Sequence, residues 1–225
     1  MDAPPPAAVL FDLDGTLVDT YRLYLECYRR ALAPHLGHVP TAEEIAARRP
    51  SAERGFLAEW VGPERVDACH AAMLEHYAAL HGALGEGMYE GVREMLAGLR
   101  SAGLRLGIVT GKGRRAWETT AAATDLGPFD VVVTEDEVRR PKPHPEGIEA
   151  ALRALGVRAG EAVYMGDSAG DLRAGRGAGA RVAAALWPKT APGERERFLE
   201  EVRPLEPDWT FDRPADLTRA FAPWC

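Results

Sequence analysis

The sequence predicts an α/β protein in which helices sandwich a parallel sheet and an all-helical domain is inserted after the first strand. Short apolar runs rich in valine and isoleucine predict the strands, at residues 8–13, 105–109, 131–133, 162–166 and 181–184. Segments with helical periodicity separate most of these runs, and strands that alternate with helices form a parallel sheet. The stretch between the first two strands reads as helical and is far too long for one crossover, which predicts the insertion.

The core helices are recognisable from apolar residues spaced on one face of a helix. Two segments show this spacing: Val92, Met95, Leu96 and Leu99 in one, and Ile148, Ala151, Leu152 and Leu155 in the other. Gly103 and Gly156 follow these segments, at the position where glycine commonly ends a helix.

We expect a core domain of residues 1–19 and 87–225 and a helical cap domain of residues 20–86. The pattern predicts three cap helices, at about residues 21–32, 43–47 and 66–80. The histidines of the last helix do not share a metal-ligand spacing on one face, so we expect a solvated helix surface at His70, His76 and His81.

Composition excludes several classes of function. A hydrophobic content of 46% over 225 residues suits an ordinary globular core. The formal charge of −7 argues against nucleic-acid binding, which needs a clustered basic face, and leaves a small charged ligand open. The N-terminus has no basic region, and Asp12 interrupts its apolar run, so we expect neither a signal peptide nor a membrane span. Cys27, Cys69 and Cys225 lack any C-x-x-C spacing, which indicates a reducing, cytoplasmic location.

Polar residues follow the predicted strands at their carboxyl ends, where open α/β sheets bind ligands. Asp12 and Asp14 follow the first strand, and the alternation of an extended backbone aims the two carboxylates in a similar direction. Thr110 and Gly111 follow the second strand with a hydroxyl and a backbone amide suited to phosphoryl oxygens. Lys142, ahead of a later helix, adds a fixed positive charge. These groups indicate a phosphorylated ligand.

Two further carboxylates, Asp167 and Asp171, follow the fourth strand and should reach the same edge of the sheet. Their mutual repulsion would raise the pKa values of the carboxyl groups unless a cation neutralised them. The candidate ligands are oxygen atoms only, which favours magnesium over zinc or copper. Mg²⁺ is therefore the expected cofactor.

At these residues the sequence resembles the haloacid dehalogenase-like (HAD) hydrolase superfamily. The four motifs of that superfamily occur in order, as Asp-Leu-Asp-Gly-Thr at 12–16, Thr110, Lys142, and Gly-Asp-Ser-Ala-Gly-Asp at 166–171. The match spans nearly the whole chain. It implies a Rossmann-like core domain and a phosphatase.

The resemblance implies that Asp12 is the nucleophile and that Asp14 protonates the leaving oxygen and later draws a proton from the hydrolytic water. Thr110 and Lys142 would stabilise charge on the transferring group. Dehalogenases of the superfamily lack the second aspartate of the first motif, so the presence of Asp14 disfavours dehalogenation.

The resemblance also implies the magnesium ligands. They would be the carboxylate of Asp12, the backbone carbonyl of Asp14 and the carboxylate of Asp167, and Asp171 would orient them.

The helical insertion looks like the cap of the phosphoglycolate phosphatase-like branch, where the cap closes over the active site and contacts the substrate. Arg48 and Arg49 lie at about the position of a substrate-facing loop, and together with Lys112 they would suit a second anionic group. We expect a small phosphorylated substrate such as phosphoglycolate. Inorganic pyrophosphatase and sugar phosphomutase remain alternatives, as do the monomeric and homodimeric states.

Two alternatives belong to other classes of function. Residues 111–116 read G-x-G-x-x-A after a strand, a dinucleotide-binding pattern, with Glu135 about twenty residues further on. That pattern leaves Asp12 and Lys142 unexplained. A non-catalytic binding protein of the same fold would have lost a motif aspartate, and none is lost. Ser168 taken alone could simply begin a helix as its N-cap.

Overall fold

The main sheet of the computed structural model has six strands in the order β5-β4-β1-β6-β7-β8, and all neighbouring pairs are parallel. The structure describes residues 5–48, 52–85 and 87–222. The strands are β1 (Ala8–Phe11), β4 (Arg105–Val109), β5 (Val131–Val133), β6 (Ala162–Gly166), β7 (Arg181–Ala185) and β8 (Trp209–Phe211). The predicted parallel sheet is confirmed. The edge strand β8 was not predicted, because Thr210 separates Trp209 from Phe211 and leaves no continuous apolar run.

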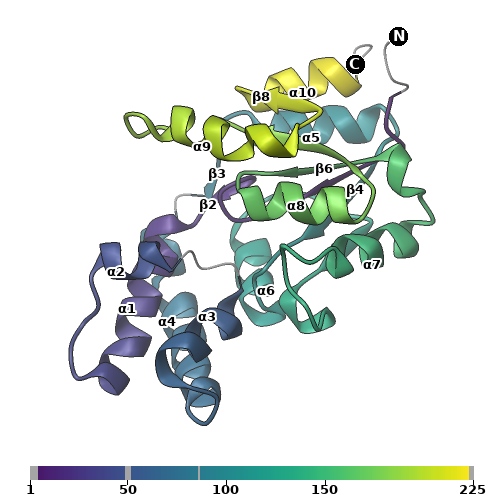
Figure 1. The fold of residues 1–225 in the computed structure, drawn as a ribbon. Coiled ribbons are helices and arrows are strands. Elements are labelled where there is room, and N and C mark those ends of the chain that lie inside the picture. The colour runs from purple at the N-terminus through teal and green to yellow at the C-terminus, as the bar shows by residue number, and fades with distance from the viewer. Residues whose placement is uncertain (1–4, 49–51, 86, 223–225) are drawn as a thin grey trace.

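Helices cover both faces of the sheet (Figure 1). Val9 and Phe11 of β1 pack on one face with residues of α5 and α10, while Ala8 and Leu10 pack on the other face with residues of α7 and α8. This alternation is the period of two of a strand that is buried on both sides. The core helices are α5 (Val92–Ser101), α6 (Arg114–Ala123), α7 (Glu146–Leu155), α8 (Ala169–Gly177), α9 (Glu194–Val202) and α10 (Pro214–Phe221), with short 3₁₀ helices η1 (Glu135–Glu137), η2 (Ala159–Glu161) and η3 (Arg203–Leu205).

Four helices between β1 and β4 pack around a second hydrophobic cluster, to which Ala116 of the core helix α6 also belongs, at the lower left of Figure 1. They are α1 (Tyr21–Leu36), α2 (Ala42–Ala47), α3 (Glu53–Val61) and α4 (Val66–Leu84). The chain leaves the core domain at β2 (Val18–Asp19) and returns to it at β3 (Gly87–Met88), and these two strands pair antiparallel. We propose that residues 20–86 form the inserted cap domain, whose limits lie beside this pair. The helix α3 was not predicted, although Phe56, Leu57 and Val61 have the spacing of one helix face.

The cap buries both of its cysteines, Cys27 and Cys69, as free thiols, whereas Cys225 lies outside the described residues. None of the helices in the described part of the chain combines the length and the apolar character that crossing a membrane requires.

One buried polar cluster joins the cap to the core. His70 Nε2 lies 3.1 Å from Glu53 Oε2, and Glu135 Oε1 accepts a hydrogen bond from the backbone N–H of Arg54 at 3.2 Å. His70 and His81 are each only 8% exposed, so the expected solvated surface is wrong for both. The sequence did not reveal this burial, because it arises from tertiary packing of the face of α4 that carries both histidines. Burial, with a contribution from the charge of Glu53, raises the pKa of Glu135 to about 7.

Two helical glycines should respond oppositely to alanine. A Cβ atom on Gly175 of α8 would lie 2.4 Å from Val182 Cγ1, whereas a Cβ on Gly82 of α4 would meet nothing within 4 Å. Gly175→Ala should lower the free energy of unfolding by about 1–3 kcal/mol through overpacking, and Gly82→Ala should raise it by about 0.5–1 kcal/mol through helix propensity. Urea denaturation measures both, and equal effects would contradict the packing of α8 on the sheet.

Glu135→Gln should change the pH dependence of stability. The folded state binds a proton at Glu135 more tightly than the unfolded chain does, so this stabilisation is complete below the ordinary pKa of 4.5 and is lost as the pH rises to about 7. Glutamine keeps an oxygen for the N–H of Arg54 and removes the charge. The variant should therefore gain stability relative to wild type between pH 5 and pH 8, by up to about 3 kcal/mol. A difference in melting temperature that stays constant across this range would show that Glu135 does not hold the proton.

Candidate active site

Three neighbouring strands bring the predicted core residues to one edge of the sheet. β1 lies between β4 and β6, and Phe11 is in register with Ile108 on one side and with Met165 on the other. The chain passes from β5, beyond β4, to β6 on the opposite side of β1, so the strand order reverses at β1. Such a switch point leaves a crevice at the carboxyl ends of the strands.

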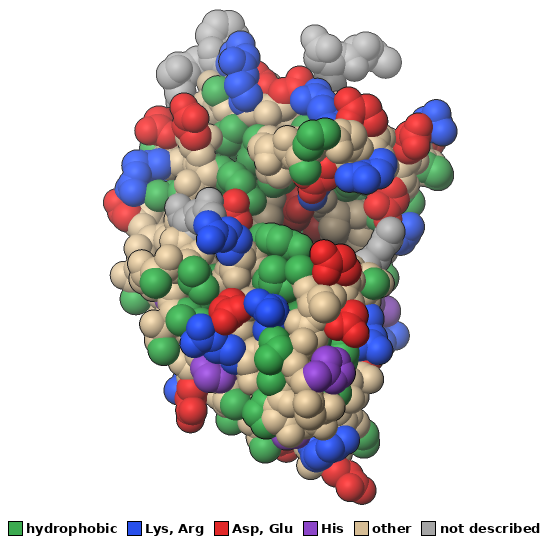
Figure 2. Space-filling view, turned by 90° about the vertical axis from the view of Figure 1, so that its left-hand side faces the viewer, with side chains coloured by type: hydrophobic (Ala, Val, Ile, Leu, Met, Phe, Trp, Pro, Cys, Tyr) green, Lys and Arg blue, Asp and Glu red, His purple; other side chains and the backbone are tan. Residues whose placement is uncertain are grey.

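A cavity of 430 Å³ opens at this edge, between the sheet and the cap. All the predicted catalytic, phosphate-binding and metal-binding residues of the core line it: Asp12, Asp14, Thr110, Gly111, Lys142, Asp167 and Asp171. The cap contributes mostly apolar and aromatic side chains, from Tyr21, Tyr24, Leu25, Tyr28, Ile45, Ala46, Ala52 and Glu53. Figure 2 shows the hollow, with acidic side chains recessed in it.

Asp12 directly follows β1, and its backbone N–H donates to the carbonyl oxygen of Met165 at 2.8 Å. Its Oδ1 accepts a hydrogen bond from Lys142 Nζ at 2.7 Å. Burial raises the pKa of Asp12 well above its ordinary value; Lys142 opposes this rise, and the charges of Asp171 and Asp167 add to it. The Asp12 carboxylate therefore depends on nearby cations to stay ionised.

Lys142 is surrounded by oxygen atoms. Besides Asp12, its Nζ donates to Asp171 Oδ1 at 2.7 Å and to the hydroxyl of Tyr164 at 3.1 Å. Burial alone would lower the pKa of Lys142, but the charges of Asp12 and Asp171 outweigh that effect and hold the pKa well above its usual value. Lys142 is thus a permanent positive charge beside Asp12.

Asp171 sits in the first turn of α8 and holds Lys142 in place. Ser168 caps the helix: its Oγ accepts from the backbone N–H of Asp171, and its own N–H and hydroxyl donate to Asp171 Oδ2 at 3.1 and 2.5 Å. The N-cap interpretation of Ser168 is therefore confirmed. Gly166 is required beside this turn, because a Cβ there would lie 2.3 Å from the Cβ of Asp171.

Asp167 follows β6 and completes an acidic cluster. Its Oδ2 accepts from Lys189 Nζ at 2.6 Å. Burial raises the pKa of Asp167, and Lys189 lowers it. Carboxylate oxygens of Asp12, Asp167 and Asp171 lie within 4.8 Å of one another. Three crowded carboxylates, two of them with raised pKa values, fit a site that could hold a hard cation.

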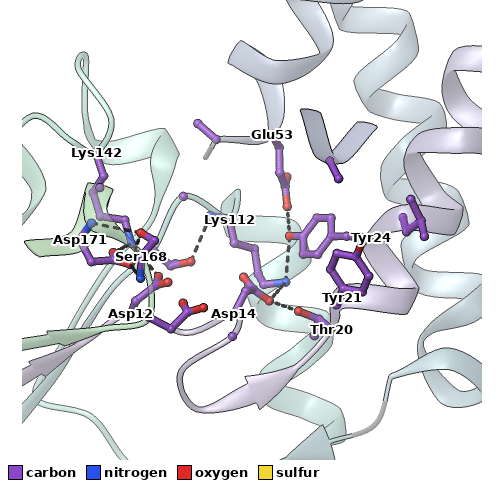
Figure 3. A pocket seen from close by; sticks show the side chains of 18 of the residues that line it. Asp12, Asp14, Thr20, Tyr21, Tyr24, Glu53, Lys112, Lys142, Ser168 and Asp171 are labelled. Carbon is purple, nitrogen blue, oxygen red and sulfur yellow. Dashed lines mark hydrogen bonds and ion pairs between the residues drawn. The ribbon is translucent and has the colours of Figure 1, made fainter. Parts of the chain in front are cut away.

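Asp14 lies at the crossing from the sheet to the cap (Figure 3). Its Oδ1 accepts from the hydroxyl of Thr20 at 2.5 Å and lies 3.0 Å from Lys112 Nζ. Lys112 Nζ also donates to the hydroxyls of Tyr24 and Tyr77 at 2.9 and 2.6 Å. An ammonium group has three N–H donors, and all three are used here. The structure thus gives no support to Lys112 as the holder of a second substrate anion.

The rarity of lysine is a sequence signal for two residues that lie outside the four family motifs. Only three of the 27 basic residues are lysines, namely Lys112, Lys142 and Lys189, and each pairs with a carboxylate that lines the cavity. Because arginine supplies the other positive charges, the composition alone could have singled out Lys112 and Lys189. A compact ammonium fits between closely spaced carboxylates, where a planar guanidinium needs more room.

The structure does not place Arg48 at the cavity. Its guanidinium lies over the ring of Trp60, 3.6 Å from the centroid, and Arg48 is not among the residues that line the pocket. Arg49 lies outside the described residues. The turn that carries the dinucleotide-binding pattern has no space for a dinucleotide, because α3 of the cap covers it. A Cβ atom on Gly113 would lie 3.0 Å from Glu53 Oε2.

Comparison with known proteins identifies the family. The model of the family "Haloacid dehalogenase-like hydrolase" matches residues 9–185. Pyrophosphatase PpaX of Anoxybacillus flavithermus is 35% identical over 213 residues, which cover 93% of this chain and 94% of that protein. A plasmid-encoded phosphoglycolate phosphatase of Cupriavidus necator is 38% identical over 196 residues, 84% of each chain.

A solved structure agrees with these relatives. The crystal structure of CbbY from Rhodobacter sphaeroides in complex with phosphate superposes with a TM-score of 0.79 at 29% identity, over 94% of this chain and 96% of that one. The predicted resemblance and the Rossmann-like α/β fold are both confirmed. The chain belongs to the haloacid dehalogenase-like hydrolase family and is a phosphatase of that family.

Proposed function

We propose that the chain hydrolyses a small phosphomonoester through an aspartyl-phosphate on Asp12. The observation that carries this proposal is the position of Asp12 in the cavity, 2.7 Å from the permanent charge of Lys142 and with the second carboxylate of Asp14 lining the same cavity. A nucleophile, a cation for the phosphoryl oxygens and a separate acid are the groups that two-step phosphoryl transfer needs.

In the first step a carboxylate oxygen of Asp12 attacks phosphorus, and the bond from phosphorus to the leaving oxygen breaks. Asp14 gives a proton to that oxygen, so the alcohol leaves as a neutral molecule. In the second step Asp14 takes a proton from water, whose oxygen attacks the phosphorus of the aspartyl-phosphate. Inorganic phosphate leaves, and both carboxyl groups return to their starting states. Lys142 and Thr110 stabilise the charge on the phosphoryl oxygens in both steps.

We propose Mg²⁺ as the cofactor, held by the carboxylates of Asp12 and Asp167 and by the backbone carbonyl of Asp14. Both oxygens of Asp171 already have partners within the chain, which leaves it the task of orienting Lys142. When bound, the ion neutralises charge on the carboxylates and the phosphoryl group. Buried free thiols at Cys27 and Cys69 suit a cytoplasmic enzyme, which we also propose.

The cap wall of the cavity favours an organic leaving group over a second phosphate. Among the described residues that line the cavity, the only basic ones are Lys112 and Lys142, and both are ion-paired with aspartates. The facing side chains of Tyr21, Leu25 and Ile45 offer apolar surface instead. Phosphoglycolate or a similar small ester is the preferred substrate class. Pyrophosphate is the second candidate, because several relatives are named pyrophosphatases.

Phosphate release should depend on Asp12. We expect magnesium-dependent release from phosphoglycolate and small aryl or alkyl phosphates, and a loss of at least about 10³-fold in kcat for Asp12→Asn, because the amide is not a nucleophile. The assay measures inorganic phosphate from phosphoglycolate, pyrophosphate, glucose phosphates and an aryl phosphate, with magnesium or with EDTA. Release from pyrophosphate alone would replace the phosphomonoester by the second candidate. Undiminished release by Asp12→Asn would rule out the aspartyl-phosphate.

Magnesium should stabilise the folded protein through Asp167. At a concentration of about 100 times Kd the ion should add about 2.7 kcal/mol, which raises Tm by about 5–10 °C in a chain of this size. The increase should be largely lost in Asp167→Asn, because an amide oxygen is a weaker ligand for a hard cation than a carboxylate. Without metal the variant should be less stable than wild type, because Lys189 loses its carboxylate partner. Thermal unfolding with magnesium, calcium or EDTA tests this. An equal increase in both proteins would place the ion elsewhere.

A further inference from the structure

Lys112 is an unusual residue for an active-site loop, because its side chain is fully buried although it carries a charge. The residue is 1% exposed and ranks among the largest fully buried side chains of the described chain. It follows β4 by three positions and extends out of the core domain into the cap. Its Nζ lies over the rings of Tyr24 and Tyr77, at 4.3 and 4.4 Å from their centroids. Two cap aromatic rings therefore enclose an ammonium group from the core.

The partners of Lys112 come from both parts of the molecule. Tyr24 belongs to α1 and Tyr77 to α4, which are cap helices, whereas Asp14 belongs to the loop after β1. Each tyrosine is anchored in turn: Tyr24 donates to Glu53 of the cap, and Tyr77 lies 2.8 Å from Thr120 Oγ1 of the core helix α6. The position of the Lys112 ammonium thus depends on the placement of the cap.

The contacts of Asp14 are asymmetric. Oδ1 meets both Thr20 Oγ1 and Lys112 Nζ, whereas no hydrogen bond or ion pair within the described residues involves Oδ2. With Oδ1 held at two points, the carboxylate plane is fixed and Oδ2 remains as the oxygen that can exchange a proton with a ligand. Asp14 lines the cavity, so a ligand can reach it.

We propose that Lys112 is a positioning residue that fixes the Asp14 carboxylate for proton transfer to the leaving oxygen, and that it does so only while Tyr24 and Tyr77 of the cap surround it. This inference rests on the proposed function, because it assigns Asp14 the proton transfer described there. It adds that docking of the cap assembles the acid as well as closing the cavity. Lys112 acts through Asp14, because all three donors of its ammonium group are used by Asp14, Tyr24 and Tyr77.

The leaving group distinguishes a positioning role from a general structural one. An alkoxide must receive a proton as its bond to phosphorus breaks, whereas 4-nitrophenolate departs without one. In Lys112→Met, which keeps the length of the side chain and removes the ammonium, kcat/KM for 2-phenylethyl phosphate should fall about 100-fold, in the range of general acid catalysis. For 4-nitrophenyl phosphate, of similar size, it should fall less than about fivefold.

Two milder variants keep the test possible if Lys112→Met does not fold. Tyr77→Phe keeps the ring over Lys112 but removes one acceptor, so it should reduce kcat/KM for the alkyl ester by about fivefold to tenfold and leave the aryl ester almost unchanged. Thr120→Val is the matched control: it removes the other partner of Tyr77 and leaves the contact between Tyr77 and Lys112 in place. Its kcat/KM should equal that of wild type for both esters, even if the variant is less stable.

A crystal structure of Lys112→Met supplies a readout that does not need activity. The proposal expects the Asp14 side chain to leave its position beside Thr20 or to occupy several rotamers. An unchanged Asp14 in that structure, or equal losses on the two esters in Lys112→Met and Tyr77→Phe, would overturn it. If wild type releases phosphate from neither ester, the proposed function fails separately, and the position of Asp14 in the variant structure still decides whether Lys112 holds it.

Discussion

The balance of charge at the carboxyl edge of the sheet is the constraint on which the rest of this structure depends. Four aspartates line one cavity, and three of them place oxygens within 4.8 Å of one another. In a buried site such carboxylates repel, and burial by itself disfavours their ionised forms. The three lysines of the chain, which come from three different segments, each form an ion pair with an aspartate at this edge and so offset the negative charge.

This balance explains why parts of the fold far from the cavity are constrained. The ammonium of Lys142 is oriented by Tyr164 and Asp171, so β6 and the first turn of α8 must meet closely, and glycine at 166 allows that approach. Buried charges that lose a partner are far more costly than buried charges that keep one. The parallel sheet thus acts as a rigid frame that sets distances between oppositely charged groups.

The cap takes part in the same balance. Its helices pack around a hydrophobic cluster that also includes Ala116 of α6, and they supply the two tyrosines around Lys112. Directional contacts to a buried ammonium define one docked position, and the polar cluster of Glu53, His70 and Glu135 adds a second such point on the boundary. The cap is therefore tied to the chemistry of the site as well as to its shape.

The sequence by itself determined the core of this protein. The alternation of apolar runs with amphipathic segments specified the parallel sheet, because period and burial are local properties. The carboxylates and Lys142 were predictable because they lie in the segments between the end of a strand and the first turn of a helix, so topology carries them to one edge. Contacts between cap and core are different, since they join residues far apart in the sequence, such as Tyr24 with Lys112, 88 positions apart, and Arg54 with Glu135, 81 positions apart. Only the tertiary structure decided that Lys112 turns to Asp14, that Arg48 stacks on Trp60 and that His70 is buried. The physical reason is that the partner of a side chain depends on the surface that covers it, and that surface exists only once the cap helices have packed against one another and against the core.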